Sequence, residues 1–257
     1  METELIKEPV KPRALEWQIS TVVKVRVETH NVKTFTLALP NWTAHRAGQH
    51  YDVRLTAPDG YQAQRSYSIA SGPEQSGQVE LTVERLEEGE VSTYLHDVLI
   101  MGDQVELRGP IGGYFVWEAR MGGPLFLVAG GSGIVPLMAM LRHRKAAGAQ
   151  VPVRLLYSSR TYDDVIYRSE LESLHNDRSG LEVIHTLTRA QPLNWKGYDR
   201  RIDLPMLEEV TRPFGKQLIA YICGPTPMVE GVANGLVSLG IQPDRIRTER
   251  FGPTGLT

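Results

Sequence analysis

The sequence is poor in cysteine, with a single residue, Cys223, among 257 positions. One thiol cannot build a disulfide framework, and it falls short of the roughly four cysteine ligands of an iron–sulfur cluster or a thiolate zinc site. We therefore expect no disulfide, no metal site and no iron–sulfur cluster within this chain.

The sequence also lacks an excess of charge of one sign and a clean hydrophobic span. Its 28 Lys and Arg nearly balance 30 Asp and Glu, and the net charge of −2 gives no broad basic field for nucleic acid or anionic lipid. Glycines and prolines interrupt the uncharged stretch between Arg120 and Arg142, which argues against a membrane span. The first residues carry no apolar segment of a secretory signal, so we expect a cytoplasmic protein.

The first half of the chain contains short segments of alternating hydrophobicity. Turn residues separate five such runs, at residues 18–28, 34–39, 51–55, 79–83 and 105–107. In the first run, Ile19 and the valines at positions 23, 25 and 27 are expected to share one face. Many short strands at close spacing indicate an antiparallel barrel, with one helix at residues 92–99.

The pattern changes after Gly122-Gly123-Pro124. Residues 125–129 form a continuously apolar run, as expected for a strand buried on both faces. Predicted helices at residues 136–145, 167–174, 204–210 and 228–239 then alternate with predicted strands at residues 153–157, 181–187, 218–222 and 246–251. This alternation predicts a parallel α/β sheet, and hence two domains, at residues 15–120 and 121–257.

A glycine loop, Gly130-Gly131-Ser132-Gly133-Ile134, follows the first buried strand and opens a helix with Pro136 in its first turn. Glycines let backbone N–H groups approach a phosphate, and a helix N-terminus adds a partial positive charge. The loop does not match the GxGxxG fingerprint, and no acidic residue follows about 20 positions on. Close packing of strand and helix is the other explanation for such a turn.

A second turn, Cys223-Gly224-Pro225-Thr226-Pro227, ends a later strand. The carboxyl ends of parallel strands share one edge of a sheet, so this turn and the glycine loop are expected to lie together. Thr226 is the expected N-cap of the next helix, with Pro227 at its first position. Cys223 is equally explained as a small buried apolar residue.

Two motifs of the barrel half carry groups suited to a phosphorylated aromatic ligand. Arg65-Ser66-Tyr67-Ser68 ends a strand and offers a guanidinium fork and a flat ring. Gly89-Glu90-Val91-Ser92 precedes a helix that Ser92 is expected to cap, and its free N–H groups would suit a second phosphate. An exposed, salt-bridged arginine and an ordinary serine cap are the alternatives.

Taken in order, the four motifs closely resemble the ferredoxin–NADP reductase superfamily, and the likeness extends over residues 17–255. In that family a flavin-binding antiparallel barrel precedes an α/β domain for the nicotinamide nucleotide, and the flavin ring lies at their junction. The resemblance implies a reductase that takes a hydride from NAD(P)H onto bound FAD and passes electrons to a separate acceptor. The chain end after Phe251 is more like the bacterial oxygenase-reductase branch.

Carried over by position, the resemblance assigns residues to the flavin. Arg65 would hold its pyrophosphate, Tyr67 would stack on the ring, and Ser68 would lie near N5. The other residues assigned to the flavin are Ser66, Val83, Arg85, Gly89, Val91, Ser92 and Phe251. Ser68, Cys223 and Glu249 are the implied catalytic residues.

A second set of residues is assigned to the nicotinamide nucleotide. Its members are Gly130, Gly131, Ser132, Gly133, Ile134, Pro136, Ser159, Arg160, Cys223, Gly224, Pro225 and Met228. Arg160 follows a strand where the adenine ribose is expected, and this favours NADPH over NADH. Asp163 and Asp164 lie close by and would weaken that preference. FAD is favoured over FMN.

The sequence does not identify the electron acceptor, so three functions stay open. The first is a reductase of a ferredoxin-like protein or an oxygenase component. The second is a reductase of free flavin or another small acceptor. The third is a flavin-binding electron-transfer subunit of a larger complex.

Overall fold

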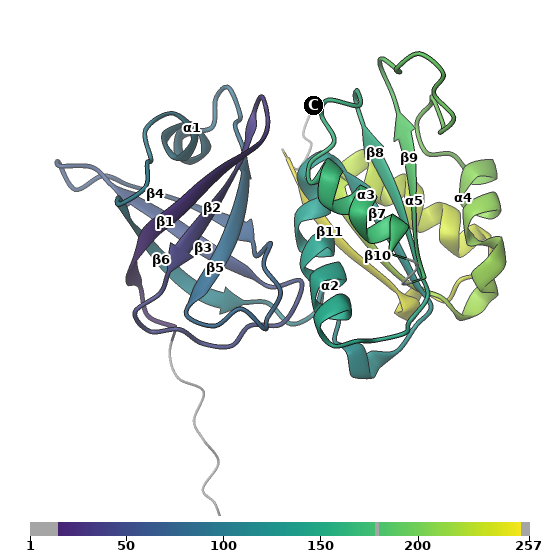
Figure 1. Cartoon of the computed structure of the whole chain (residues 1–257), viewed down its shortest axis with the longest axis horizontal. Helices are drawn as coiled ribbons and strands as arrows, with labels where there is room; N and C mark the ends of the chain where they lie inside the picture. The colour runs from purple at the N-terminus through teal and green to yellow at the C-terminus, as the bar shows by residue number, and fades with distance from the viewer. Residues whose placement is uncertain (1–14, 178–179, 253–257) are drawn as a thin grey trace, which may run out of the picture.

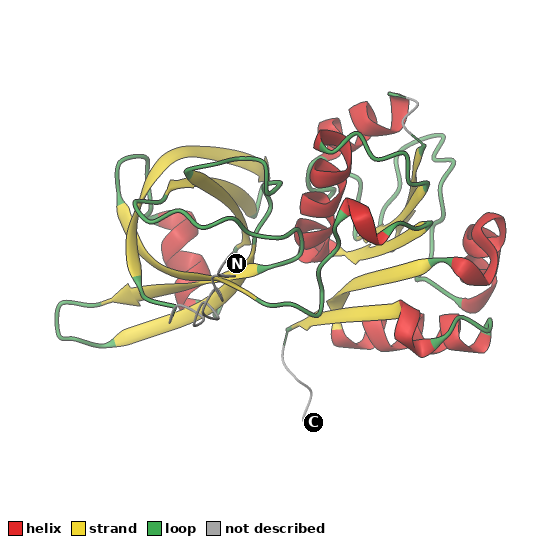
Figure 2. Cartoon of the chain, turned by 90° about the horizontal axis from the view of Figure 1, so that it is seen from below, coloured by secondary structure: helices red, strands yellow, loops and turns green. Residues whose placement is uncertain are grey.

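The computed structural model describes residues 15–177 and 180–252, which build two β-sheets side by side (Figure 1). The first sheet has six strands in the order β4-β3-β6-β1-β2-β5, and all its pairs are antiparallel. Its elements are β1 (Gln18–Thr29), β2 (Val32–Ala38), β3 (His50–Thr56), β4 (Gln62–Ser68), β5 (Gln78–Glu84), α1 (Glu90–Asp97) and β6 (Gln104–Ile111). This sheet curls into the expected barrel, with α1 at one end (Figures 1 and 2).

The second sheet has five parallel strands in the order β11-β10-β7-β8-β9. Helices cover both of its faces (Figure 2), so the predicted parallel α/β sheet is confirmed. Its strands are β7 (Leu125–Gly130), β8 (Val153–Ser159), β9 (Leu181–Leu187), β10 (Ile219–Pro225) and β11 (Ile246–Phe251). Its α-helices are α2 (Ile134–Ala146), α3 (Arg168–Asn176), α4 (Leu204–Thr211) and α5 (Thr226–Ser238). Short 3₁₀ turns are η1 (Ala119–Met121), η2 (Gly131–Gly133), η3 (Arg212–Gln217) and η4 (Pro243–Arg245).

The apolar run in β7 is continuous because both faces of that strand are covered. Leu125, Leu127 and Ala129 join the cluster that contains the buried residues of α2 and α3. Phe126 and Val128 alternate with them and join the cluster on the side of α4 and α5. A strand between two helical layers therefore has no solvent face to make polar.

The expectation of one shared face in β1 is wrong. Ile19, Val23 and Val27 are 54%, 37% and 66% exposed, whereas Val25 packs against the barrel core. The register of β1 against β2 shifts between Val22 and Lys24, and such a bulge breaks the simple alternation of side chains.

Two predicted helix caps are also wrong. Helix α1 begins at Glu90 with Gly89 as its N-cap, so Ser92 lies inside the first turn, where its hydroxyl donates to the Gly89 carbonyl at 3.0 Å. Helix α5 begins at Thr226 with Pro225 as its N-cap. In each helix the N-cap precedes the expected cap residue, and neither Gly89 nor Pro225 has a side chain that could accept a helix N–H.

The strand β5 joins the barrel to the second sheet. Val79, Leu81 and Val83 point into the barrel core. The alternate residues Glu80, Thr82 and Glu84, which we call the interdomain face of β5, bond to the other half of the molecule. Glu80 Oε2 accepts from Arg142 Nη1 at 2.8 Å, Thr82 Oγ1 accepts from the Tyr167 hydroxyl, and Glu84 Oε2 accepts from Ser132 Oγ at 2.7 Å.

The expected domain boundary at residues 120 and 121 lies between the last barrel strand and β7, and it stays a prediction.

None of the helices in the described part of the chain is long and apolar enough to cross a bilayer.

Candidate functional site

The glycine loop and the Cys223 turn meet at the carboxyl edge of the second sheet, as expected. β7 and β10 are neighbours, with Ala129 opposite Cys223. A Cβ on Gly133 would lie 2.1 Å from the Cys223 carbonyl oxygen, so a side chain there would clash with backbone. Met228 packs over Gly130, with its sulfur 2.6 Å from where a Cβ would lie. Packing thus accounts for part of the glycine pattern.

Packing does not account for Gly131. This residue has a φ of +53°, and a Cβ there would meet nothing within 4 Å. The helix behind it, α2, has no acidic residue in its first turn, and no side chain caps its start. The loop therefore presents a helix N-terminus to open space, and this arrangement suits the phosphates of a nucleotide.

The side chains of Ile134 and Pro136 are buried in the first turn of α2. They contribute to the core on which the loop rests. On the other side of the edge, Phe251 pairs with Pro225 at the end of β11 and is 36% exposed. Gly224 lies at the same edge and packs closely against Gly130, since a Cβ on Gly224 would lie 3.2 Å from the Gly130 backbone.

The predicted flavin strand β4 places Arg65 and Tyr67 on one face and Ser66 on the other. Ser66 Oγ donates to Asp52 Oδ1 at 2.6 Å, so its hydroxyl is already engaged. Tyr67 packs partly against the barrel core, and burial raises its pKa to about 12, which keeps the phenol neutral. Ser68 is the last residue of β4 and pairs with His50.

Arg65 is exposed and donates to the Gln64 carbonyl at 2.6 Å. Among residues 15–177 and 180–252, no carboxylate lies within ion-pair distance of its guanidinium. The alternative of a salt-bridged arginine does not describe this side chain. An unpaired guanidinium next to a half-buried tyrosine ring fits an anionic aromatic ligand.

The residues around the start of α1 differ in what they can offer. Val83 and Val91 are each 1% exposed in the barrel core, which leaves only their backbone to a ligand. Arg85 forms a two-pronged ion pair with Asp97 at 2.9–3.1 Å. Gly89 packs against Ser92, whose Oγ would lie 2.3 Å from an added Cβ. Their assigned roles stay predictions.

Cys223 and Glu249 are partners on the neighbouring strands β10 and β11. Cys223 is 3% exposed, and burial together with the nearby Glu249 raises the pKa of its thiol well above the usual value. Burial also raises the pKa of Glu249 to about 7. Its Oε2 is buried without a hydrogen-bond partner among the described residues. Glu249 is therefore a carboxyl group that gains and loses its proton near neutral pH.

Thr226, at the start of α5, has a buried hydroxyl with no partner in the described part of the chain. Buried polar atoms in folded proteins nearly always have a partner. An unpaired hydroxyl at the strand edge, like the unpaired oxygen of Glu249, fits a site where a bound molecule completes the hydrogen bonds. The sequence predicted a cap at Thr226 and missed this feature.

Ser159 and Arg160 lie at and just beyond the end of β8. Ser159 is 6% exposed, whereas Arg160 is exposed and has no ion-pair partner among the described residues. Asp164 instead accepts from the Thr161 amide at 3.0 Å and from its hydroxyl at 2.7 Å. Asp163 pairs with Arg168 at 3.3 Å. Neither acid neutralises the Arg160 guanidinium.

Glu84 is a residue of the site to which the sequence gave no role. It lies inside the Val83-Glu84-Arg85 segment, yet its carboxylate contacts Ser132 of the glycine loop across the two domains. The alternation of β5 would have shown that Glu84 points away from the barrel core. The element that it faces is visible only in the fold.

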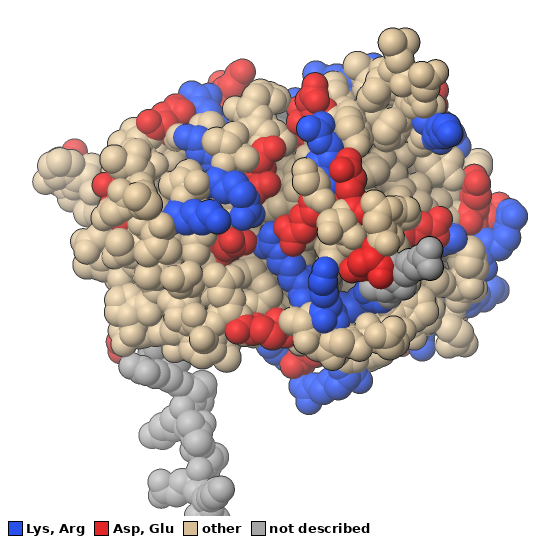
Figure 3. Space-filling view, in the orientation of Figure 1, with Lys and Arg blue, Asp and Glu red and all other residues tan. Residues whose placement is uncertain are grey.

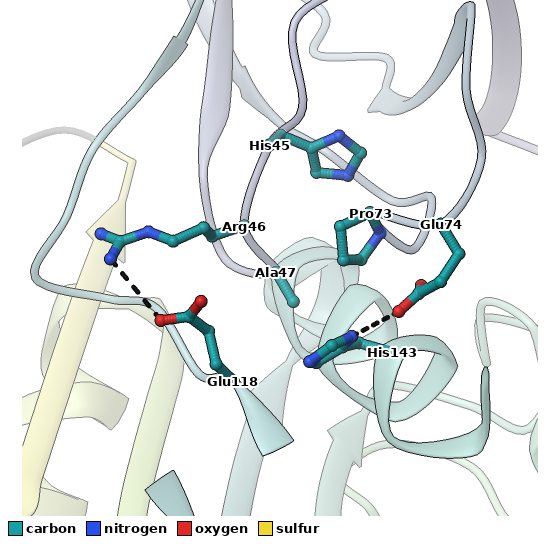
Figure 4. Close-up of a pocket in the computed structure, with 7 residues that line it drawn as sticks. All are labelled: His45, Arg46, Ala47, Pro73, Glu74, Glu118 and His143. Atoms are coloured by element: carbon teal, nitrogen blue, oxygen red, sulfur yellow. Dashed lines mark hydrogen bonds and ion pairs between the residues drawn. The ribbon is translucent and has the colours of Figure 1, made fainter. Parts of the chain in front are cut away.

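A cavity of about 270 Å³ lies elsewhere between the two sheets (Figure 4). Its lining residues are His45, Arg46, Ala47, Pro73, Glu74, Glu118 and His143. The charged groups pair with one another, His143 Nδ1 with Glu74 at 2.6 Å and Arg46 with Glu118 at 3.7 Å. None of the sequence-predicted site residues lines it, and we assign it no ligand.

Charges of both signs are intermixed on the face shown in Figure 3, and many lie near the junction of the two domains. This face therefore offers no single docking polarity for a charged partner.

Two family models match the chain. The model described as an oxidoreductase FAD-binding domain matches residues 20–116, and the model described as an oxidoreductase NAD-binding domain matches residues 127–234. Each model falls on one of the two sheets described above.

Several curated relatives are named as reductases. The glycine betaine monooxygenase reductase subunit of Pseudomonas aeruginosa is 35% identical over 239 residues, which are 90% of this chain and 63% of that protein. NADH-cytochrome b5 reductase 1 of Pyricularia oryzae is 28% identical over 250 residues, which are 93% of this chain and 78% of that protein. The chain spans about 63% of the length of the oxygenase reductase subunits that it matches.

Solved structures share the fold. The cytochrome P450 reductase of Amycolatopsis superposes with a TM-score of 0.79 at 26% identity, over 94% of this chain and 72% of that one. A ferredoxin NADP+ reductase of Neisseria gonorrhoeae, with bound FAD and NADP, gives a TM-score of 0.77 at 22% identity, over 91% and 98%.

Proposed function

We propose that the chain is an NAD(P)H-dependent flavoprotein reductase of the ferredoxin–NADP reductase superfamily, because an oxidoreductase FAD-binding model and an oxidoreductase NAD-binding model match its two halves. In this proposal it takes a hydride onto FAD and passes electrons to a separate acceptor. The observation that carries the proposal is the hydrogen bond from Ser132 to Glu84. It joins the glycine loop of one domain to the barrel strand that leads to the flavin motif of the other.

The residues of the barrel fit FAD. In the proposal, Arg65 binds the pyrophosphate, Tyr67 supplies a flat apolar surface for the ring, and Ser68 places a hydroxyl near N5. Arg65 has no ion-pair partner among the described residues, and this supports the arrangement, as does the neutral phenol of Tyr67. When bound, FAD supplies the hydride acceptor, and the protein supplies placement.

The carboxyl edge of the second sheet fits the nicotinamide nucleotide. In the proposal, the loop from Gly131 to Gly133 binds the phosphates through backbone N–H groups and the N-terminus of α2. The Cys223-Gly224-Pro225 turn lies beside the nicotinamide ring, and its buried thiol excludes water there. The unpaired hydroxyl of Thr226 supports a ligand at this edge.

Glu249 is proposed to hold and move a proton at its Oε2. Its pKa of about 7 lets both protonation states exist at neutral pH, as a group that exchanges protons requires.

We propose a preference for NADPH over NADH. The support is the Arg160 guanidinium, which has no ion-pair partner in the described part of the chain, since Asp163 and Asp164 are engaged with Arg168 and Thr161. A guanidinium fork suits a 2′-phosphate. One relative carries NADH in its name, so any test must compare the two nucleotides directly.

The acceptor is proposed to be a redox protein such as a ferredoxin-like protein or an oxygenase component. The names of two relatives, a monooxygenase reductase subunit and a phenol hydroxylase protein, support an oxygenase system. A cytoplasmic location stays a prediction of the sequence.

An anaerobic visible spectrum before and after addition of NADPH or NADH tests the proposal. The expected result is an oxidised-flavin spectrum that bleaches, faster with NADPH. A protein that stays colourless after reconstitution with FAD would overturn the proposal. Turnover with ferredoxin or cytochrome c, compared with free riboflavin, then identifies the class of acceptor. Activity with riboflavin alone would replace the protein acceptor by a small one.

A further inference from the structure

Glu84 differs from the other two residues of the interdomain face of β5, because it touches the glycine loop itself. Ser132 Oγ donates to Glu84 Oε2 at 2.7 Å, and Ser132 stands between Gly131 and Gly133. Glu80 and Thr82 contact Arg142 and Tyr167, which lie outside the loop. A carboxylate of the barrel therefore lies beside the loop that, in the proposed function, receives the nucleotide phosphates.

The charge of Glu84 is not compensated by a cation. Among residues 15–177 and 180–252, no Lys, Arg or His lies within ion-pair distance of its carboxylate. The adjacent Arg85 is engaged with Asp97 on the other side of the strand end. The negative charge of Glu84 therefore opposes the partial positive charge at the start of α2.

A bound phosphate would also compete with Glu84 for the Ser132 hydroxyl. A serine hydroxyl has one proton to donate, so Ser132 serves either Glu84 or a phosphate oxygen at any moment. Binding of a phosphate breaks the contact with Glu84 and brings two negative groups close together. Both effects weaken the binding of the nucleotide.

We propose that Glu84 is a positioning and affinity-setting residue of the nucleotide site. It holds the Ser132 hydroxyl when the loop is empty, and its charge lowers the affinity of the loop for the phosphates. This inference rests on the proposed function. Its consequence is faster release of the oxidised nucleotide, which leaves the flavin accessible for the next step of the reaction.

The test is equilibrium binding of 1,4,5,6-tetrahydro-NADP to the flavin-loaded protein, wild type and Glu84→Gln. This probe has a neutral ring and gives up no hydride, so that binding is measured without turnover. Glutamine keeps the size of the side chain and an oxygen that accepts from Ser132, but it removes the charge. We expect a Kd about tenfold lower at low salt, or ~1.4 kcal/mol. The gain shrinks in 0.5 M salt, because screening weakens the repulsion between Glu84 and the phosphates.

Glu80→Gln is the matched control. Glu80 lies on the same face of the same strand and contacts the second domain through Arg142, but not through the loop. A general loosening of the domain contact would change the affinity in both variants. We expect the Kd of Glu80→Gln to stay within about twofold of the wild-type value.

A second comparison tests the role of the hydroxyl. Glu84→Met removes the acceptor as well as the charge, so its affinity should exceed that of Glu84→Gln in the wild-type background. In a Ser132→Ala background there is no proton to compete for, and this gain of Glu84→Met over Glu84→Gln should be smaller. An equal gain in both backgrounds would overturn the positioning part of the inference. Nicotinamide riboside, which has no phosphate, should show no tightening with Glu84→Gln.

The outcomes separate this inference from the proposed function. If the wild-type protein binds none of the probe, NADPH and NADH, the proposed function fails. If the wild type binds and Glu84→Gln binds equally well, only the role of Glu84 is overturned. Weaker binding of Glu84→Gln overturns it too, and would instead make Glu84 an acceptor for a ribose hydroxyl.

Discussion

Replacing Glu249 with glutamine should stabilise the protein at alkaline pH, and the gain should disappear in acid. The side chain lies on β11 beside Cys223, and its Oε2 has no hydrogen-bond partner in the described part of the chain. Burial raises its pKa from 4.5 to about 7. The folded protein therefore holds this proton more tightly than the unfolded chain does.

The sign of the effect follows from proton linkage. A group with a raised pKa in the folded state contributes stability below its unfolded pKa, and that stability is lost as the pH rises through the folded pKa. For Glu249 the loss occurs between about pH 4.5 and pH 8. At 1.36 kcal/mol per pKa unit, it reaches about 3 kcal/mol. Glutamine has no proton to lose, so the variant avoids this cost.

The assay is thermal or urea unfolding of the flavin-loaded wild type and Glu249→Gln between pH 4.5 and pH 8.5. The difference in Tm should grow by roughly 6–12 °C across this range. Glu230→Gln is the control, because it removes a carboxylate of the neighbouring helix α5 whose side chain is 58% exposed. A difference between Glu249→Gln and wild type that stays constant from pH 5 to pH 8 would refute the reasoning.

Three other substitutions test other parts of the structure. Arg65→Ala should lower the FAD content of the purified protein while its circular dichroism stays unchanged; full FAD occupancy would contradict the pyrophosphate assignment. Arg160→Ala should raise the KM for NADPH about tenfold more than that for NADH, since a hydrogen bond to a charged group contributes roughly 1.5–3 kcal/mol; equal increases would remove the 2′-phosphate argument. Arg142→Met should lower the free energy of unfolding by about 3 kcal/mol, because it leaves Glu170 without its cation and Glu80 with only the longer contact to Arg26 at 3.7 Å. In urea denaturation, a loss below about 1 kcal/mol would show that this network contributes little to stability.

The sequence predicted the two sheets because each has a periodicity that follows from what covers it. Val79, Leu81 and Val83 alternate because one face of β5 fills the barrel. The β7 run from Leu125 to Ala129 is continuous because helices cover both faces. Such patterns depend only on neighbours along the chain, so they can be recognised without the fold.

The starts of two helices were not predictable in the same way. Ser92 and Thr226 are residue types that often cap helices, but the sequence does not show which peptide is the first to turn. At α1 the extended residue is Gly89, with φ −89° and ψ 96°, and Ser92 follows it three positions later. At α5 it is Pro225, with ψ 139°. The residues near the start of each helix were therefore predicted better than the position at which the helix begins.

The electrostatics of the site were beyond the sequence for a different reason. Glu249 is one of 30 acidic residues, and nothing in its neighbours along the chain marks its pKa as raised. The shift comes from burial at the edge of the parallel sheet, beside Cys223, which lies 26 positions away. Only the fold brings these groups together.

The alternation of β5 identifies the two faces of the strand, but it does not show what covers the polar face. A barrel strand with apolar residues inside and Glu80, Thr82 and Glu84 outside has the pattern of an ordinary solvated face. Thr82 is only 5% exposed, however, and the Glu80 side chain only 14%. A polar face that is buried must have partners, because an unpaired buried polar group is costly. Those partners come from α2, from the residue before α3 and from the glycine loop. The strand thus holds the glycine loop against the barrel, and under the proposed function this contact sets the position of the nucleotide relative to the flavin.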